Sequence, residues 1–197
     1  NELRSRLRTN PDTNVAVCVL DTGANNGHAL LEPVLSDADC HTVEPNWGVN
    51  DHLGHGTLMC GIAAFGDLQG SLQRNDLIKV AHCLESVKVI PPHGVNEPDL
   101  YGDITIQGVS RAEIQAPARS HIGCMAVTSE DGRDHGRPTS WSAAIDKLTS
   151  GYDDDNKRLF IVSAGNNLER DEWPRYPQNN LKYSVHDPGQ SWNALTV

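Results

Sequence analysis

Short runs of apolar residues, many of them β-branched, recur along the chain between turn and polar residues. The runs that predict strands are residues 15–20, 77–84, 86–90, 121–128 and 159–164. An unbroken apolar run of this length is typical of a strand that is buried on both faces, as strands are in parallel sheets. Residues 39–44 are expected to add an edge strand, and residues 194–197 begin a last strand.

Helical patterns lie between these runs. A helix rich in Gly and Ala is expected over residues 55–65, and an amphipathic helix over 103–116 with Asp103 as its cap. A third helix is expected to begin within residues 138–141. Strands that alternate with helices predict an α/β fold, a doubly wound and mostly parallel sheet with helices on both faces.

The whole chain, residues 1–197, is expected to form a single domain, because no linker interrupts this alternation. Residues 1–14 are polar and are expected to be a solvated segment. The chain carries 16 Lys and Arg against 26 Asp and Glu, a net charge of −10. This balance argues against nucleic acid and against anionic membranes as partners, and no apolar run approaches the length of a membrane span.

Five cysteines cannot all pair, and Cys18, Cys60 and Cys124 lie in apolar segments. Buried free thiols are therefore favoured over disulfides, which predicts a reducing, cytoplasmic location. A metal site is the alternative for some of these residues. It would combine His52, His55 and Cys60 with Cys40 and His41, but this spacing matches no common zinc pattern. We predict no metal and no cofactor.

Three polar residues follow or open apolar elements in a chemically suggestive order. Asp21 ends the run 15–20, His55 lies between two glycines at the start of the Gly- and Ala-rich helix, and Asn166 follows the run 159–164. In open α/β sheets, chemistry takes place outside the carboxyl ends of the strands. An acid that orients an imidazole base, together with an amide that stabilises an oxyanion, fits acyl transfer.

The sequence Asp21-Thr22-Gly23 is also typical of aspartic proteases. That chemistry needs two such carboxylates, and the chain contains no second Asp-Thr-Gly or Asp-Ser-Gly. A single-chain aspartic protease is therefore excluded. A dimeric one stays open on this stretch alone, although it leaves His55-Gly56-Thr57 unexplained.

These motifs together resemble the subtilisin-like serine proteases: Asp-Thr-Gly after an apolar strand, His-Gly-Thr opening a helix, and Ser163-Ala164-Gly165-Asn166 after a later strand. The resemblance implies a serine endopeptidase in which Asp21 orients His55, His55 is the general base and Asn166 stabilises the oxyanion. It also implies that substrate binds along Val127, Thr128 and Ser129 and beside Gly165. In the family, Ser-Leu-Gly occupies the place of Val127-Thr128-Ser129.

The main departure from the family is the nucleophile, because no Gly-Thr-Ser occurs in the chain. The chain is similar to the N-terminal part of the family's catalytic domain, so the serine is expected beyond Val197 and the chain alone is expected to be inactive. The resemblance further implies a peptide or protein substrate, an uncovered apolar surface through which the chain self-associates, and a partner ATPase. The alternative is a non-catalytic pseudoprotease that binds a peptide or a partner protein.

Overall fold

A six-stranded parallel sheet forms the centre of the molecule. The computed structural model describes residues 2–129 and 136–197. The sheet has the order β3-β5-β2-β6-β7-β8, and all its strand pairs are parallel. Its strands are β2 (Val15–Asp21), β3 (Cys40–Thr42), β5 (Cys83–Lys88), β6 (Ser120–Met125), β7 (Leu159–Val162) and β8 (Leu195–Thr196).

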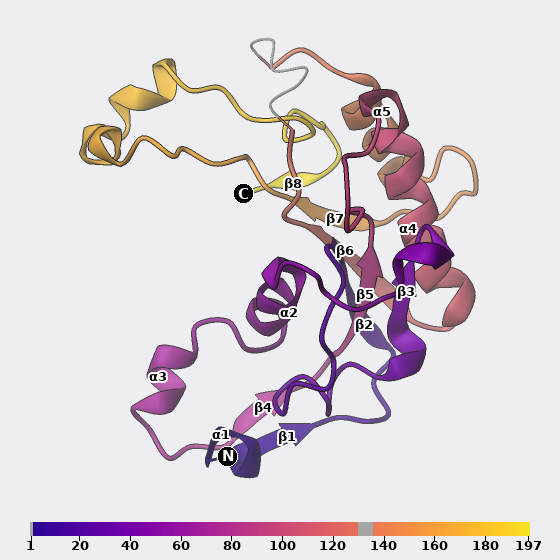
Figure 1. Cartoon of the computed structure of the whole chain (residues 1–197), viewed down its shortest axis with the longest axis vertical. Coiled ribbons are helices and arrows are strands. Elements are labelled where there is room, and N and C mark those ends of the chain that lie inside the picture. The colour runs from indigo at the N-terminus through magenta and orange to yellow at the C-terminus, as the bar shows by residue number, and fades with distance from the viewer. Residues whose placement is uncertain (1, 130–135) are drawn as a thin grey trace.

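Helices cover both faces of this sheet, as Figure 1 shows. Helix α2 (His55–Phe65) packs on one face, while α4 (Tyr101–Gln115) and α5 (Ser140–Ser150) pack together on the other. The doubly wound α/β fold expected from the sequence is confirmed, and so is the edge strand within residues 39–44. Helix α4 starts at Tyr101, two residues before the expected cap Asp103.

Two hydrophobic clusters lie on opposite sides of the sheet. Strand β2 contributes alternately to both, because successive side chains of a strand point to opposite faces. Cys18 and Leu20 join the cluster beneath α4 and α5, and Val19 joins the cluster beneath α2. This double burial explains why the strand reads as an unbroken apolar run.

The N-terminal segment, expected to be solvated, is folded, and among residues 2–14 only Leu7 is buried. Residues 2–9 form α1 (Glu2–Arg6) and β1 (Leu7–Thr9), and β1 pairs in parallel with β4 (Ile78–Val80) in a separate two-stranded sheet. Leu7 is only 8% exposed, because it packs into the cluster beneath α2. The single strand expected over residues 77–84 is therefore two strands in the structure. Its first part is β4, which pairs with β1, and its last residues begin β5.

The remaining connections are loops and short helices. Helix α3 (Leu68–Leu72) follows α2, and single 3-10 turns occupy Asp37–Asp39, Pro45–Trp47 and Pro98–Leu100. The long segment before β8 contains two further 3-10 helices, Arg170–Arg175 and Gln178–Leu181. Figure 1 shows this segment extending from the body of the molecule on the side of α2.

Candidate active site

Asp21 and His55 lie in direct contact at the carboxyl edge of the sheet. Asp21 is the last residue of β2 and His55 the first of α2. The imidazole Nδ1 lies 2.8 Å from Oδ1 and 2.9 Å from Oδ2 of the carboxylate. Because an ionised carboxylate can only accept, Nδ1 carries the proton and Nε2 keeps its lone pair. The arrangement can therefore present a base at Nε2.

Burial differs sharply between these two side chains. The side chain of Asp21 is 1% exposed, whereas that of His55 is 48% exposed. The backbone N–H of Thr22 donates to Asp21 Oδ1 at 2.7 Å, which helps to satisfy the buried carboxylate. The pair thus combines a fixed, shielded acid with an imidazole that solvent or a ligand can reach.

Gly56 permits the close approach of α2 to the end of β2. A Cβ at this position would overlap the carbonyl oxygen of Gly23 and lie 3.2 Å from the Cβ of Asp21. Only glycine therefore lets the first turn of the helix lie against the strand end. The glycine after His55 in the sequence motif has this steric role.

Asn166 lies at the same edge of the sheet, after β7. Its side chain is exposed and makes no hydrogen bond to any of the described residues, so its amide is available to a ligand. Gly165 has a φ of 110°, and a Cβ there would overlap the ring of His186. The backbone N–H of His186 donates to Ala164 at 2.9 Å, which holds the turn beneath Asn166.

The predicted substrate wall, Val127–Ser129, follows β6. The backbone of Ser129 pairs with Asp187 in an antiparallel bridge, its N–H donating at 2.8 Å and its carbonyl accepting at 3.0 Å. The backbone groups of Val127 and Thr128 make no such bonds within the described parts of the chain. These two residues leave backbone donors and acceptors open to an extended ligand.

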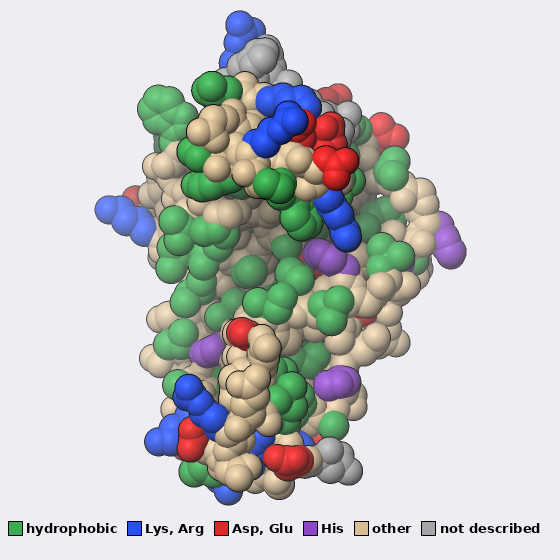
Figure 2. Space-filling model, turned by 90° about the vertical axis from the view of Figure 1, so that its left-hand side faces the viewer, with side chains coloured by type: hydrophobic (Ala, Val, Ile, Leu, Met, Phe, Trp, Pro, Cys, Tyr) green, Lys and Arg blue, Asp and Glu red, His purple; other side chains and the backbone are tan. Residues whose placement is uncertain are grey.

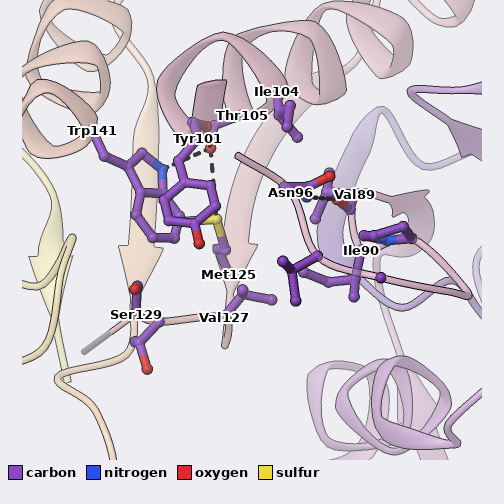
Figure 3. Close-up of a pocket in the computed structure, with 14 residues that line it drawn as sticks. Val89, Ile90, Asn96, Tyr101, Ile104, Thr105, Met125, Val127, Ser129 and Trp141 are labelled. Atoms are coloured by element: carbon purple, nitrogen blue, oxygen red, sulfur yellow. Dashed lines mark hydrogen bonds between the residues drawn. The ribbon is translucent and has the colours of Figure 1, made fainter. Parts of the chain in front are cut away.

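A largely apolar cavity of about 160 Å³ adjoins this wall. Figure 3 shows Tyr101 and Trp141 at its back and Val127 and Ser129 along one side, opposite the segment that follows β5. The two aromatic rings contact each other at 4.8 Å between centroids. Trp141 donates to Thr105 at 2.9 Å, so the back of the cavity is firmly held.

Sequence reasoning missed two residues that build the site. Asp51, between the turn at Pro45–Trp47 and α2, accepts hydrogen bonds from Thr22 and from the first turn of the helix. Lys88, at the end of β5, is 2% exposed and donates to Asn50 at 2.7 Å. For Asp51 a signal was present, since an acid just before a helix is typical of a cap.

Other candidate chemistry does not come together in the described residues. His52, His55 and Cys60 form no cluster that could hold a metal ion there, and Cys60 points into the core beneath α2. All five cysteines are unpaired. Burial raises the pKa of the Cys60 thiol to about 12. Within residues 2–129 and 136–197, every helix is too short or too polar to cross a lipid bilayer.

Four acidic residues follow the two segments predicted to line the substrate, and their positions in the sequence predict an acidic rim that would favour basic substrate residues. Glu130, Asp131 and Asp134 lie outside the described residues. The fourth, Glu169, is exposed and accepts from Lys182 at 3.3 Å, so its charge is compensated locally.

The fold is that of a doubly wound α/β protein, and the contact between Asp21 and His55 gives it a candidate acid–base site at the carboxyl edge of the sheet. The model of the subtilase family (peptidase S8) matches residues 12–197. The chain belongs to this family.

Several solved structures share the fold of this chain. The S41 psychrophilic protease is 23% identical with a TM-score of 0.59 over 95% of this chain, and sphericase is 22% identical with a TM-score of 0.55 over 95%. The epidermin leader peptide processing serine protease of Staphylococcus aureus is 20% identical with a TM-score of 0.55 over 93%. The chain covers 54%, 54% and 45% of these proteins, about half their length. No curated protein sequence matches the chain.

Proposed function

We propose that this chain supplies the acid and the base of a serine endopeptidase. The observation that carries the proposal is the contact between buried Asp21 and half-exposed His55 in a subtilase-family fold. Asp21 holds the tautomer in which Nε2 accepts a proton from the attacking hydroxyl. The resulting imidazolium then protonates the leaving amine.

Asn166 completes the proposed chemistry. Its uncommitted amide would donate to the oxyanion of the tetrahedral intermediate, where charge develops. The substrate would lie as an extended strand against Val127 and Thr128, with one apolar side chain in the adjoining cavity. Gly165, whose missing side chain makes room for the ring of His186, is proposed to contact the substrate through its backbone. No metal enters this proposal, since proton transfer and oxyanion binding account for acyl transfer.

The nucleophile is proposed to come from residues after Val197. The side chain of His55 bonds to Asp21 alone within the described residues. Ser163 is the serine in the motif before Asn166, but its Oγ accepts from the backbone of Gly165 at 3.1 Å and has a structural role.

A fluorophosphonate probe tests this proposal. The chain 1–197 should take up no label, and a longer chain from the same gene should be labelled at a serine beyond Val197 and should cleave a fluorogenic peptide. Asn166→Ala in the longer chain should lower kcat, whereas Asn167→Ala should not. Labelling of the chain 1–197 would contradict the placement of the nucleophile. A longer chain that binds peptide without labelling or cleavage would favour a pseudoprotease.

We further propose that the chain 1–197 associates with a second copy of itself. Leu58 and Ile62 of α2 are 66% and 58% exposed, and Leu159 and Leu195 at the far edge of the sheet are each 52% exposed. Among the described residues, α2 covers β2 and β5 on this side of the sheet but not β7 and β8. Figure 2 shows hydrophobic side chains gathered across the middle of this face, around a hollow. An apolar face beside an unpaired sheet edge favours association.

Sedimentation velocity over a wide concentration range tests the association. Ile62→Lys should shift the chain toward monomer. The matched control is Ile114→Lys, because Ile114 is 79% exposed on α4, on the opposite face of the sheet. A wild-type chain that remains monomeric at all concentrations would contradict the proposal.

A further inference from the structure

The contact between Asp21 and His55 joins residues that are 34 positions apart in the sequence. The strand end and the helix start must therefore be held together by something other than chain connectivity. The segment that precedes α2, residues 48–54, runs between them. One side chain of this segment, Asp51, bonds to both elements.

Both carboxylate oxygens of Asp51 are used. Oδ1 accepts from the hydroxyl of Thr22 at 2.8 Å and from the backbone N–H groups of Leu53 and Gly54 at 3.0 and 2.8 Å. Oδ2 accepts from the N–H and the hydroxyl of Thr57 at 2.8 and 2.6 Å. Asp51 thus caps the first turn of α2 and at the same time bonds to the residue next to Asp21.

Thr22 closes the connection into a ring. While its hydroxyl donates to Asp51, its oxygen accepts from the N–H of Gly56 at 2.9 Å. The path from Asp21 through Thr22 and Asp51 to the turn that carries His55 therefore consists of bonds of 3.0 Å or less. Such a ring fixes both the distance between strand and helix and the rotation of the helix about its axis.

The segment that carries Asp51 is itself anchored. The ammonium of Lys88 donates to the carbonyls of Asn50 and Trp47 at 2.7 and 3.3 Å, and the N–H of Ala24 donates to Val49 at 3.3 Å. Burial alone would raise the pKa of Asp51, but the hydrogen bonds led by those from Thr57 outweigh it and hold the pKa well below its usual range. Asp51 therefore stays ionised and accepting at neutral pH.

From this ring we infer that Asp51 is a positioning residue for His55, acting through Thr22 and Thr57 without touching the substrate. This inference rests on the proposed function, in which His55 is the general base. Without Asp51, the five hydrogen bonds that it accepts are lost, two of them from Thr57 in the first turn of α2, and the imidazole is expected to leave Asp21 more often. Among the described residues, the side chain of Asp51 accepts hydrogen bonds from Thr22, Leu53, Gly54 and Thr57.

The test observes the imidazole proton directly, so that no nucleophile is required. In the chain 1–197 with 15N-labelled histidine, a proton on Nδ1 that is bonded to a carboxylate gives a resonance far downfield of the amides. Asp21→Asn should abolish that resonance and thereby assign it. Asp51→Ala should abolish it as well, or should accelerate its exchange with water by about tenfold or more.

Matched variants separate positioning from general destabilisation. Asp67→Ala is the control, because Asp67 caps α3 by accepting from Gln69 at 2.8 Å and has no contact with the ring. That variant should keep the resonance. Thr22→Val, which keeps the side-chain shape but removes the hydroxyl, should lose it, and Thr22→Ser should restore it. If Asp51→Ala fails to fold by circular dichroism, the two Thr22 variants decide.

The outcomes are distinguishable. Folded Asp51→Ala and Thr22→Val chains that keep the wild-type resonance and exchange rate would overturn the positioning role while leaving the proposed function intact. A wild-type chain without a resonance that depends on Asp21 would contradict the Asp21–His55 pair itself, and the positioning role with it.

Discussion

One carboxylate–imidazole pair lies at the edge of the central sheet and a second lies within it, and their surroundings differ. At the carboxyl edge, Asp21 contacts Nδ1 of His55 at 2.8 Å. In the next strand, Glu85 of β5 lies 3.2 Å from Nε2 of His121 on β6. Both carboxylates are almost fully buried, at 1% and 0% exposure of the side chain. The acids alone therefore do not distinguish the two pairs.

The surroundings of the imidazole make the difference. The side chain of His55 is 48% exposed at a strand end, whereas that of His121 is 9% exposed within a strand. Glu85 also accepts from Arg119 at 2.9 Å, and Arg119 binds Asp39 at 2.6 Å. The first pair leaves one ring nitrogen accessible, while the second is enclosed in a charge network that links β5 and β6 to the segments before β3 and β6. The accessible imidazole, not the buried acid, therefore distinguishes the pair for which we propose a catalytic role.

The largest effect is expected at the first pair. Asp21→Asn in a longer, serine-bearing chain should lower kcat by about 10⁴-fold, because an amide favours the wrong tautomer of His55. Glu85→Gln in the same chain should leave kcat nearly unchanged. Peptide cleavage and thermal melting, measured together, check this contrast. Equal losses of kcat in the two variants would break the distinction between the pairs.

Disruption of the second pair, Glu85 and His121 with Arg119, is expected to lower the free energy of unfolding. Arg119→Ala leaves Glu85 and Asp39 buried without their cation, and should lower the free energy of unfolding by about 3 kcal/mol, the lower end for a broken buried pair because Arg119 is 26% exposed. Urea unfolding of the chain 1–197 measures this loss. Arg4→Ala breaks an exposed pair with Glu32 and should cost less than about 1 kcal/mol.

A matched glycine pair in α2 tests how closely the helix must approach the first site. Gly56→Ala should destabilise the chain by about 2 kcal/mol and displace His55, because the new methyl group overlaps Gly23. Gly61→Ala meets no atom within 4 Å and should stabilise the helix by about 0.5–1 kcal/mol. Stabilisation by both substitutions would contradict the tight contact.

The smallest expected effect is a dependence of the melting temperature on pH. Burial raises the pKa of Glu85 although Arg119 opposes it, so the folded chain favours the neutral acid more than the unfolded chain does. The stability that this group contributes is present below its unfolded pKa of about 4.3 and declines as the pH rises through the higher folded value. Melting temperatures from pH 4 to pH 8 should decline less in Glu85→Gln than in the wild type. If the melting temperatures of Glu85→Gln and the wild type depend on pH in the same way, Glu85 does not contribute this pH dependence.

Local sequence was sufficient for much of the fold. The run 15–20 predicted β2 because a strand covered on both faces must be apolar throughout. The Gly- and Ala-rich segment after Gly54 predicted α2 with its observed bounds. Asp21 and His55 were recognised because each terminates or opens such an element. The resemblance to the subtilases then implied that Asp21 orients His55, and the structure shows the two side chains in contact.

Other features depended on partners far away in the chain. The N-terminal residues looked solvated because β1 has little apolar character, and only its pairing with β4 buries Leu7. Glu85 looked like a break between two apolar runs, yet β5 continues through it because Arg119 and His121 approach from β6 and its preceding turn. A polar residue can lie in a buried strand only when such partners are present.

The sequence by itself determined the approximate strands of the central sheet, the main helices and the acid–base motif, because apolar periodicity and short motifs act over a few residues. Beyond the pair Asp21 and His55, only the tertiary structure decided which polar groups meet. Register pairs Asp21 with Lys88 and places Cys18 beside Glu85. Asp51 accepts a hydrogen bond from Thr22, which follows β2, and it lies in the segment that Lys88 anchors. The register of these strands therefore places Asp51 against the start of α2. Hydrogen bonds require contact to within about 3 Å. Contact at that precision between distant segments is a property of packing, which no local pattern encodes.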